Sequence, residues 1–273
     1  MSEKKIFVDS HCHLNLIVKK DFDTRLTDEN IVEAENLIKE LREKNINIVN
    51  VGTSLIESEN CLELANISDM VKAVIGIHPC DINENWSDEI DTIEDYLKNS
   101  EYKDKIVGIG ECGFDKYHEP YDISLQETVF KKQIELAVKY NKALIIHSRD
   151  AADETLKVLK EYKDSLKKVI VHCFSYDTEF AKQVVSWGFK LGIGGPITYP
   201  KNEYLREIVK TVGLQNIVLE TDAPYLTPQK YRGEPNTPLY IPLIAEYIAN
   251  LLNCSIDEVA DITTQNCTEL FNG

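Results

Sequence analysis

The sequence lacks the segments that carry a protein into or across a membrane. No apolar run approaches the roughly 18 residues that a membrane-spanning helix needs. The N-terminus leads into strand-like sequence without the apolar core and cleavage site of a secretory signal. The seven cysteines form no C-x-x-C pair, and their odd number does not suit a disulfide framework. We therefore expect a cytoplasmic protein with reduced thiols and no membrane contact, a monomer by default.

Basic residues are scarce as well. Lysine and arginine total 30 against 46 aspartates and glutamates, so the formal net charge is −16. This balance argues against a broad basic face that binds duplex nucleic acid through counterion release. It leaves phosphate chemistry open, because bound divalent cations can supply positive charge locally.

Glycine and proline, at 12 and 9 residues, form no linker, and we find no low-complexity tract or close repeat. Short β-branched runs instead alternate with amphipathic segments along the whole chain. Strands are expected at 6–9, 46–51, 71–77, 106–110, 143–146, 169–171, 189–193 and 217–219. Helices are expected at 29–44, 57–66, 89–97, 125–140, 152–162, 178–187, 203–212, 241–252, 256–262 and 264–271.

This alternation predicts parallel βαβ units of the α/β class. At this length the economical closure is one (β/α)8 TIM barrel, a single domain over residues 1–273. An open, doubly wound sheet is the structural alternative. The first strand is not followed by a Gly-x-Gly-x-x-Gly motif, which weakens a dinucleotide-binding version of that alternative.

Two histidines leave the first predicted strand together. His11 and His13 project to the same side, because side chains alternate along a strand, and two adjacent imidazoles can hold a cation such as Zn²⁺. Paired histidines also occur in ordinary hydrogen-bonded turns, so this pair alone is a weak signal. Other possible ligands follow later strands, namely Glu111, His147, His172 and Asp222. In a barrel all six lie at the C-terminal rim, where active sites occur.

The chemistry of these six side chains suits divalent metals. Imidazole and carboxylate ligands together bind Zn²⁺, Mn²⁺ or Mg²⁺. Four imidazoles and two carboxylates exceed the needs of one tetrahedral ion, so we expect two divalent ions. Two ions can clamp the attacking and leaving oxygens of a displacement and activate water.

Six sequence blocks carry a resemblance to a known family. They are Asp9-Ser-His-Cys-His-Leu14, Gly76-Ile-His-Pro79, Gly110-Glu-Cys-Gly-Phe-Asp115, Ile145-Ile-His-Ser-Arg-Asp-Ala151, Val171-His-Cys-Phe-Ser175 and Glu220-Thr-Asp-Ala-Pro224. In this order, over nearly the whole chain, they resemble the signature blocks of the TatD metal-dependent deoxyribonucleases, which belong to the amidohydrolase superfamily of barrels.

The resemblance implies a role for each ligand. His11, His13 and Asp222 would hold one metal, His147 and His172 the second, and Glu111 would bridge the two. Asp222 would also orient or deprotonate the attacking water, so Asp222 and Glu111 are the expected catalytic residues. Members of the family cleave DNA, typically at the 3′ end of single strands, and some relatives remove D-amino acids from tRNA.

One stretch departs from the family pattern. Relatives usually carry a basic Arg-Gly-Lys-Arg-Asn-x-Pro run after the last strand, whereas this chain has Glu234 and Pro235 at the two central basic positions. Arg232 is retained, and we expect it to contact substrate. The loss of positive charge predicts weaker attraction for a phosphate backbone.

Three other residues are expected to contact substrate. His78 would touch a phosphate or base, with a structural strand-exit histidine as the alternative. Arg149 would hold a phosphate, or else form a rim salt bridge. Phe174 would stack on a base, although an aromatic after a strand is more often packing.

The remaining chemistry-bearing side chains are assigned structural places. Strand alternation points Cys12, Cys112 and Cys173 away from the ligands and into the core. Cys80 is expected to pack within a loop, and His118 to lie in a solvated loop.

These observations predict a phosphodiesterase that degrades DNA from a single-stranded 3′ end with two divalent ions. A D-aminoacyl-tRNA deacylase, or another ester or amide hydrolase, is the enzymatic alternative. A barrel that binds nucleic acid without catalysis would not need six metal-site residues.

Overall fold

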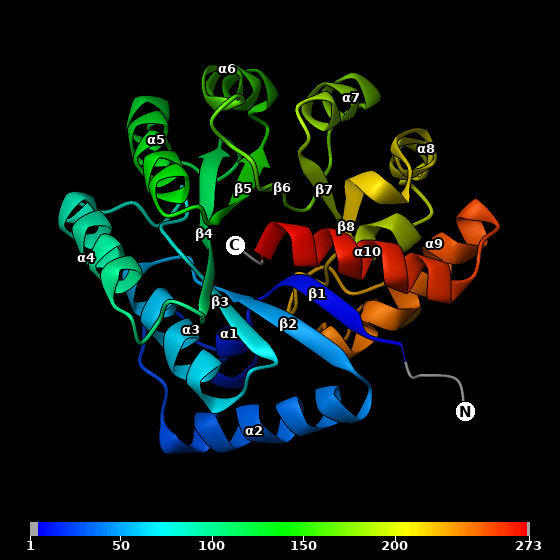
Figure 1. The fold of residues 1–273 in the computed structure, drawn as a ribbon, viewed down its shortest axis with the longest axis horizontal. Coiled ribbons are helices and arrows are strands. Elements are labelled where there is room, and N and C mark those ends of the chain that lie inside the picture. The colour runs from blue at the N-terminus through cyan, green and yellow to red at the C-terminus, as the bar shows by residue number, and fades with distance from the viewer. Residues whose placement is uncertain (1–4, 272–273) are drawn as a thin grey trace.

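The computed structural model describes residues 5–271 and shows a ring of parallel strands surrounded by helices (Figure 1). The eight strands lie in sequence order in one parallel sheet that curls into a nearly closed (β/α)8 barrel, which confirms the expected fold. The strands are β1 (Phe7–Cys12), β2 (Ile46–Val51), β3 (Val71–Ile75), β4 (Ile106–Asp115), β5 (Ala143–Arg149), β6 (Val169–Val171), β7 (Lys190–Ile193) and β8 (Ile217–Leu219).

Several helices begin at a polar side chain that caps their free backbone N–H groups. Thr27, Asp122 and Asp177 each accept a hydrogen bond from the backbone three residues later, at 3.3, 3.0 and 2.9 Å. The helices are α1 (Leu14–Lys19), α2 (Asp28–Glu43), α3 (Leu55–Ile67), α4 (Trp86–Lys98), α5 (Ile123–Lys139), α6 (Ala152–Tyr162), α7 (Thr178–Ser186), α8 (Glu203–Val212), α9 (Ile241–Leu252) and α10 (Ile256–Phe271).

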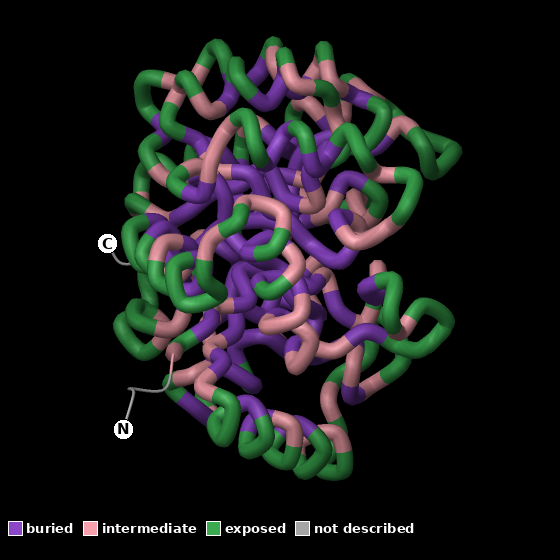
Figure 2. The backbone as a smooth tube through the Cα atoms, turned by 90° about the vertical axis from the view of Figure 1, so that its right-hand side faces the viewer, coloured by how far each residue is buried: buried purple, intermediate pink, exposed green. Residues whose placement is uncertain are grey.

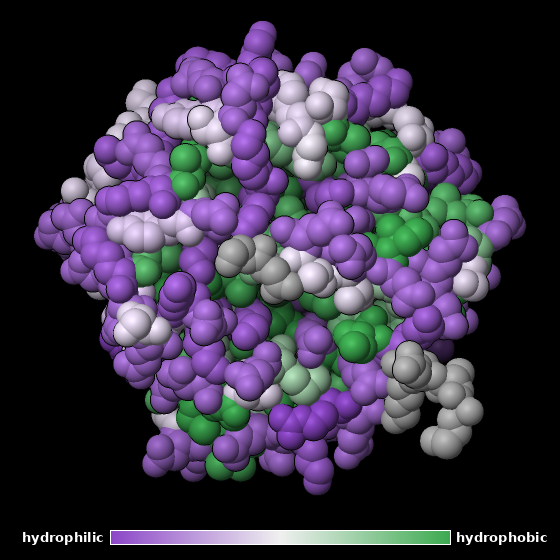
Figure 3. Space-filling model, in the orientation of Figure 1, coloured by the Kyte–Doolittle hydropathy of each residue, from purple (hydrophilic) through white to green (hydrophobic). Residues whose placement is uncertain are grey.

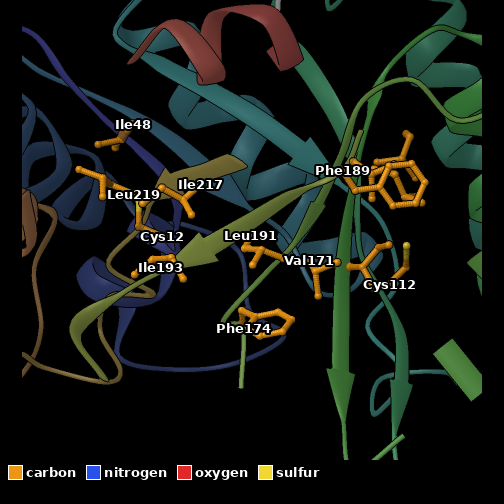
Figure 4. Packing of buried hydrophobic residues seen from close by; sticks show 14 of the residues in the cluster. Cys12, Ile48, Cys112, Val171, Phe174, Phe189, Leu191, Ile193, Ile217 and Leu219 are labelled. Carbon is orange, nitrogen blue, oxygen red and sulfur yellow. The ribbon is translucent and has the colours of Figure 1, made fainter. Parts of the chain in front are cut away.

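Hydrophobic side chains form two layers. Buried residues, purple in Figure 2, lie in the interior of the fold. The outer layer packs the strands against the helices, and Figure 4 shows part of it. The inner layer fills the barrel with side chains such as Val49, Val74, Ile145 and Val218. Cys267 and Leu270 of α10 join this inner layer, and α10 crosses the barrel end that faces the viewer in Figure 1. Helix α10 therefore closes one end of the barrel and leaves the opposite rim for the site.

The barrel closes between its first and last strands through the residues that follow β8. Asp222 N donates to His11 O at 2.9 Å, and His13 N donates to Ala223 O at 2.8 Å. The buried carboxylate of Asp9 accepts the backbone N–H of Thr221 at 2.8 Å. These bonds fix Asp222 beside both histidines, although they lie more than 200 residues apart in the chain.

Helices α9 and α10 come nearest to a membrane-spanning pattern. Within residues 5–271, no single helix is long and apolar enough to cross a membrane, and these two would pass only as a pair bent by 114°. The face in Figure 3 is mainly hydrophilic, with separate rather than continuous hydrophobic areas.

Candidate metal centre

The six predicted ligands come together at the C-terminal ends of the strands. Three of them, His11, Glu111 and His147, are within β1, β4 and β5, and His172 directly follows β6. All six lie near one another although they come from five different βα units. Their ligand atoms fall into groups within 4.8 Å, namely His11–His13–Asp222, His11–Glu111–His172 and His78–Glu111–His147.

Glu111 lies at the middle of this cluster. Its Oε2 atom is 3.3 Å from His11 Nε2. Its Oε1 atom is 2.8 Å from His147 Nδ1 and 3.8 Å from Nε2 of His172. The two oxygens of one carboxylate thus face different histidines.

Asp222 closes the other side of the cluster. Its Oδ1 atom lies 3.5 Å from His13 Nε2, 3.6 Å from His172 Nε2 and 3.8 Å from His11 Nε2. The rings of His11 and His172 stack with centroids 3.5 Å apart. Four side chains from three parts of the barrel therefore direct nitrogen and oxygen atoms at one small volume.

Each of three histidines has an acceptor behind its ring. His13 Nδ1 lies 2.8 Å from Val51 O, His147 Nε2 lies 2.9 Å from Asp115 Oδ2, and His172 Nδ1 lies 3.1 Å from Glu220 Oε2. A proton held on the outer nitrogen leaves the lone pair of the other nitrogen for a metal. The carbonyl of Val51 and the carboxylate of Asp115 therefore leave the inner nitrogens of His13 and His147 able to bind a metal, and Glu220 forms an ion pair with the outer nitrogen of His172.

Asp115 and Glu220 were given no role from the sequence, although both are buried beside the predicted ligands. The sequence held a signal for Glu220. It precedes Asp222 by two residues, so strand alternation continued past β8 would point both side chains to the same side. Asp115 ends a signature block, but its partner His147 is 32 residues away. Only the pairing of β4 with β5 brings the two together.

Glutamine side chains of α5 hold the ends of two strands. Gln126 accepts from Asp115 N at 3.1 Å and donates to Asp115 O at 2.9 Å. Gln133 binds both backbone groups of Ile77 in the same way, each at 2.9 Å. Buried amides thus satisfy the backbone where β3 and β4 deliver residues to the site.

The electrostatics of the cluster fit a cation. Burial alone would raise the pKa of Glu111, but His172 and His11 hold it well below its usual value. Burial would also raise the pKa of Asp222, but His172 and His13 lower it. Burial would lower the pKa of His172, yet Glu220, Glu111 and Asp222 raise it to about 10. The carboxylates of Glu111 and Asp222 thus both favour the ionised form.

Within residues 5–271, the ion pairs of Glu111 and Asp222 all go to histidines. Buried charge needs a counter-charge. Imidazole nitrogens and carboxylate oxygens are ligands of borderline and hard divalent ions. The donor set therefore suits a divalent metal, with Glu111, Asp222 and the surrounding histidines as ligands.

The four expected substrate contacts have different surroundings. His78 lies inside the cluster rather than outside it, with Nε2 3.8 Å from Glu111 Oε1 and its ring 4.3 Å from that of His147. Arg149 and Arg232 are exposed, and their guanidinium groups lie over Tyr117 and Tyr199, 3.9 and 4.5 Å from the ring centroids.

The prediction for Phe174 is wrong. Its side chain is only 3% exposed and belongs to the outer hydrophobic layer (Figure 4). Its ring packs against Tyr176 and Phe180, with centroids 6.3 and 5.8 Å away. No ring face is left for a base.

The cysteine assignments are confirmed for two residues and wrong for two. Cys12 and Cys112 are fully buried in the outer layer. Cys173 is only half-buried, and its sulfur lies within 4.8 Å of ligand atoms of His172 and Asp222. The positive φ of 45° at Cys173 ends the strand alternation on which its core assignment depended. Cys80 is exposed rather than packed.

Comparison with known proteins agrees with this geometry. The family model described as TatD related DNase matches residues 8–272. YabD of Bacillus subtilis, named an uncharacterized metal-dependent hydrolase, is 34% identical over 96% of this chain and 98% of its own length. YcfH of Escherichia coli K12, with the same description, is 32% identical over 97% of this chain and 95% of its own.

A crystal structure extends the similarity to three dimensions. The TatD homologue YjjV from Escherichia coli K12 superimposes with a TM-score of 0.85 at 26% identity and covers 98% of each chain. The chain therefore belongs to the TatD-related DNase family of metal-dependent hydrolases.

Proposed function

We propose that this protein hydrolyses phosphodiester bonds of DNA, as a 3′–5′ exonuclease on single-stranded ends, with two divalent ions at this centre. The placement of Glu111 carries the proposal. One of its oxygens faces His11 at 3.3 Å and the other faces His147 at 2.8 Å. A carboxylate with one oxygen toward each of two groups of histidines could bridge two metal ions, whether these are Mg²⁺, Mn²⁺ or Zn²⁺.

When bound, the ions would supply positive charge to the scissile phosphate and its attacking water. Asp222 is the base in this proposal. Its carboxylate is ionised, because His172 and His13 keep its pKa low against the effect of burial. Asp222 Oδ1 lies within 3.8 Å of three imidazoles, so it can accept a proton at the centre of the ligand set.

Side chains on the rim support a nucleic-acid substrate. The guanidinium groups of Arg149 and Arg232 lie over the rings of Tyr117 and Tyr199, and their N–H groups can bind a phosphate. Tyr225 is 40% exposed, and its ring lies 6.1 Å from that of His13. An exposed ring beside the ligands can stack on an unpaired base. With a net charge of −16, the chain suits a short single-stranded end better than a long duplex.

We also propose that the protein works in the cytoplasm. All seven cysteines are unpaired, and Cys12, Cys61, Cys112 and Cys267 are buried. Free thiols in these numbers suit a reducing compartment.

The test is a metal-restoration assay. Protein stripped with a chelator is supplied separately with Mg²⁺, Mn²⁺ or Zn²⁺ and incubated with end-labelled single- and double-stranded DNA. We expect shortening from the 3′ end of single strands with at least one ion. Glu111→Gln and His172→Ala should abolish it, whereas Glu35→Gln, at an exposed position of α2, should not.

Two results would contradict the proposal. Retained shortening in Glu111→Gln would remove Glu111 from the mechanism. No shortening by the native protein with any ion would exclude DNA, and aminoacyl-tRNA and small amides or esters would be the next substrates. Tight DNA binding without any hydrolysis would instead favour a non-catalytic barrel.

A further inference from the structure

A second group of side chains that could hold a metal ion lies beside the proposed centre. Cys80 Sγ is 3.8 Å from His118 Nδ1, and this nitrogen is 3.1 Å from Asp115 Oδ2. The three ligand atoms lie within 4.8 Å of one another. Cys80 and His118 belong to none of the roles assigned above.

The loop after β4 builds this arrangement. Asp115 Oδ1 accepts the backbone N–H groups of Tyr117 and His118 at 2.9 and 2.8 Å. These bonds turn the chain back, so that the His118 ring returns to Oδ2 of the same carboxylate. Cys80 comes from the turn after β3, where its N–H donates to His78 Nδ1 at 3.1 Å. Two separate loops thus converge on Asp115.

We propose that Cys80, Asp115 and His118 form a separate, solvent-accessible site for a divalent cation of the zinc class. In tetrahedral zinc sites, metal–ligand bonds of about 2.0–2.3 Å place neighbouring ligand atoms roughly 3.3–3.6 Å apart. The separations of 3.1 and 3.8 Å lie close to these values. Three protein ligands leave the fourth position for water or another oxygen ligand.

The types of ligand determine which metal ion this site would prefer. A thiolate with an imidazole favours Zn²⁺ or Co²⁺ over Mg²⁺, which prefers oxygen. Burial and the carboxylates of Asp115 and Asp81 raise the pKa of the Cys80 thiol to about 12, and a bound cation would offset this negative charge. Binding would release the thiol proton of Cys80 to solvent, and His118 would carry its ring proton on Nε2.

Asp115 connects this site to the main centre. The same Oδ2 atom lies 3.1 Å from His118 and 2.9 Å from His147 Nε2. The central cluster also has a cysteine nearby, Cys173, which lies with His172 and Asp222. A thiolate signal must therefore be assigned to one cysteine or the other.

Cobalt distinguishes the two cysteines. The stripped full-length protein is loaded with Co²⁺ and its near-ultraviolet spectrum is recorded, because thiolate–cobalt bonds absorb there and imidazole or carboxylate bonds do not. We expect the absorption in the native protein and in Cys173→Ser, its loss in Cys80→Ser, and its weakening in His118→Ala. Zinc bound per chain should fall by one equivalent in Cys80→Ser.

The proposal is overturned by no thiolate absorption in the native protein, or by an absorption that survives Cys80→Ser and disappears in Cys173→Ser. Unchanged zinc content in Cys80→Ser overturns it equally. Circular dichroism of each variant establishes that the fold is intact. These readouts do not depend on hydrolysis, so they stand apart from the nuclease assay.

Discussion

Asp115 Oδ2 lies 2.9 Å from His147 Nε2, on the side of the ring away from Glu111. Asp115 is fully buried, and its backbone is held on both sides by Gln126. Burial opposes ionisation, but hydrogen bonds from His147 and His118 keep the pKa of Asp115 far below its usual value. The carboxylate therefore fixes a proton on Nε2 and leaves Nδ1 for a metal.

Asp115→Asn should weaken metal binding, because the amide can present its N–H to His147 and favour the wrong tautomer. Loss of such an outer partner typically costs about 10–100-fold in metal affinity. Competition with a chromophoric chelator measures this change. Asp91→Asn, at an exposed position of α4, is the control. Equal affinities in the two variants would show that Asp115 does not orient His147.

Gly192 of β7 leaves space for the Glu220 side chain, and an added Cβ would collide with the carboxylate. Gly192→Ala should displace Glu220 from His172 and from Cys173 N, whose bond to Glu220 is 2.7 Å. We expect a loss of about 1–3 kcal/mol in the free energy of unfolding, together with weaker metal binding. Urea unfolding and metal titration measure the two effects.

Gly188→Ala is the matched control for this substitution. Its Cβ would meet nothing within 4 Å, but its φ is +87°. Alanine there should cost stability through the backbone alone, about 1 kcal/mol. Metal affinity should be unchanged. If Gly192→Ala also keeps native metal affinity, Glu220 does not position His172.

A buried ion pair between Glu57 and Lys19 supports the segment that follows His13. Glu57 Oε1 is 2.7 Å from Lys19 Nζ and also accepts from Asp23 N at 2.8 Å. Glu57 Oε2 accepts from Asn15 Nδ2 at 2.7 Å, two residues after His13. Glu57→Gln should cost about 3–5 kcal/mol, because it leaves the Lys19 charge buried. Glu63→Gln, at an exposed position of the same helix, should change unfolding by less than about 0.5 kcal/mol.

The Glu57–Lys19 pair predicts that the free energy of unfolding depends on pH. Burial would raise the pKa of Glu57, but Lys19, Asn15 and Asn60 lower it overall. The unfolded state then binds the proton more readily, so stability rises with pH in this window. The contribution should be complete above the unfolded pKa of about 4.3 and be lost as the pH falls through the lower folded pKa. Urea unfolding of metal-free protein should show the difference between native and Glu57→Gln shrinking below that point; a difference that grows on acidification would contradict it.

Arg149→Ala should weaken binding of single-stranded DNA and flatten its salt dependence. Each phosphate contact contributes about 0.7 to the slope of log affinity against log salt for single strands. The measurement uses Glu111→Gln protein, so that DNA is not cut. Arg42→Ala is the control. Arg42 lies in the last turn of α2 and is not one of the expected substrate contacts. A slope that is the same in both variants would leave Arg149 without a phosphate contact.

The barrel could be predicted from the sequence because its elements are regular and their order is simple. The expected strands at 46–51, 169–171 and 217–219 agree with β2, β6 and β8 residue for residue. Strand β4 runs to Asp115 rather than ending at Gly110, because Gly113 and Phe114 still pair with His147 and Ser148 of β5. Gly113 has a φ of +142° and lies against the His147 backbone, so glycine here continues the strand instead of ending it.

Two helical features were not predictable from local patterns. Helix α1 has six residues, too few to show a helical period. Helix α10 is continuous over Ile256–Phe271 where two helices were expected, and its threonines donate to backbone carbonyls. Thr263 donates to Val259 O at 2.7 Å and Thr264 to Ile6 O at 3.0 Å. Position on a strand end predicted the six candidate ligands, which the fold brings together, whereas Asp115 and Glu220 contact partners that only the folded sheet brings near.

The bridging role of Glu111 is tested most directly by electron paramagnetic resonance of Mn²⁺. Stripped protein is reloaded with two equivalents of Mn²⁺ per chain, as native protein, Glu111→Gln and Glu35→Gln. The account predicts a spin-coupled spectrum in the native protein and in Glu35→Gln, and only isolated Mn²⁺ in Glu111→Gln. A native protein that binds two Mn²⁺ without coupling, or coupling that survives in Glu111→Gln, would contradict it.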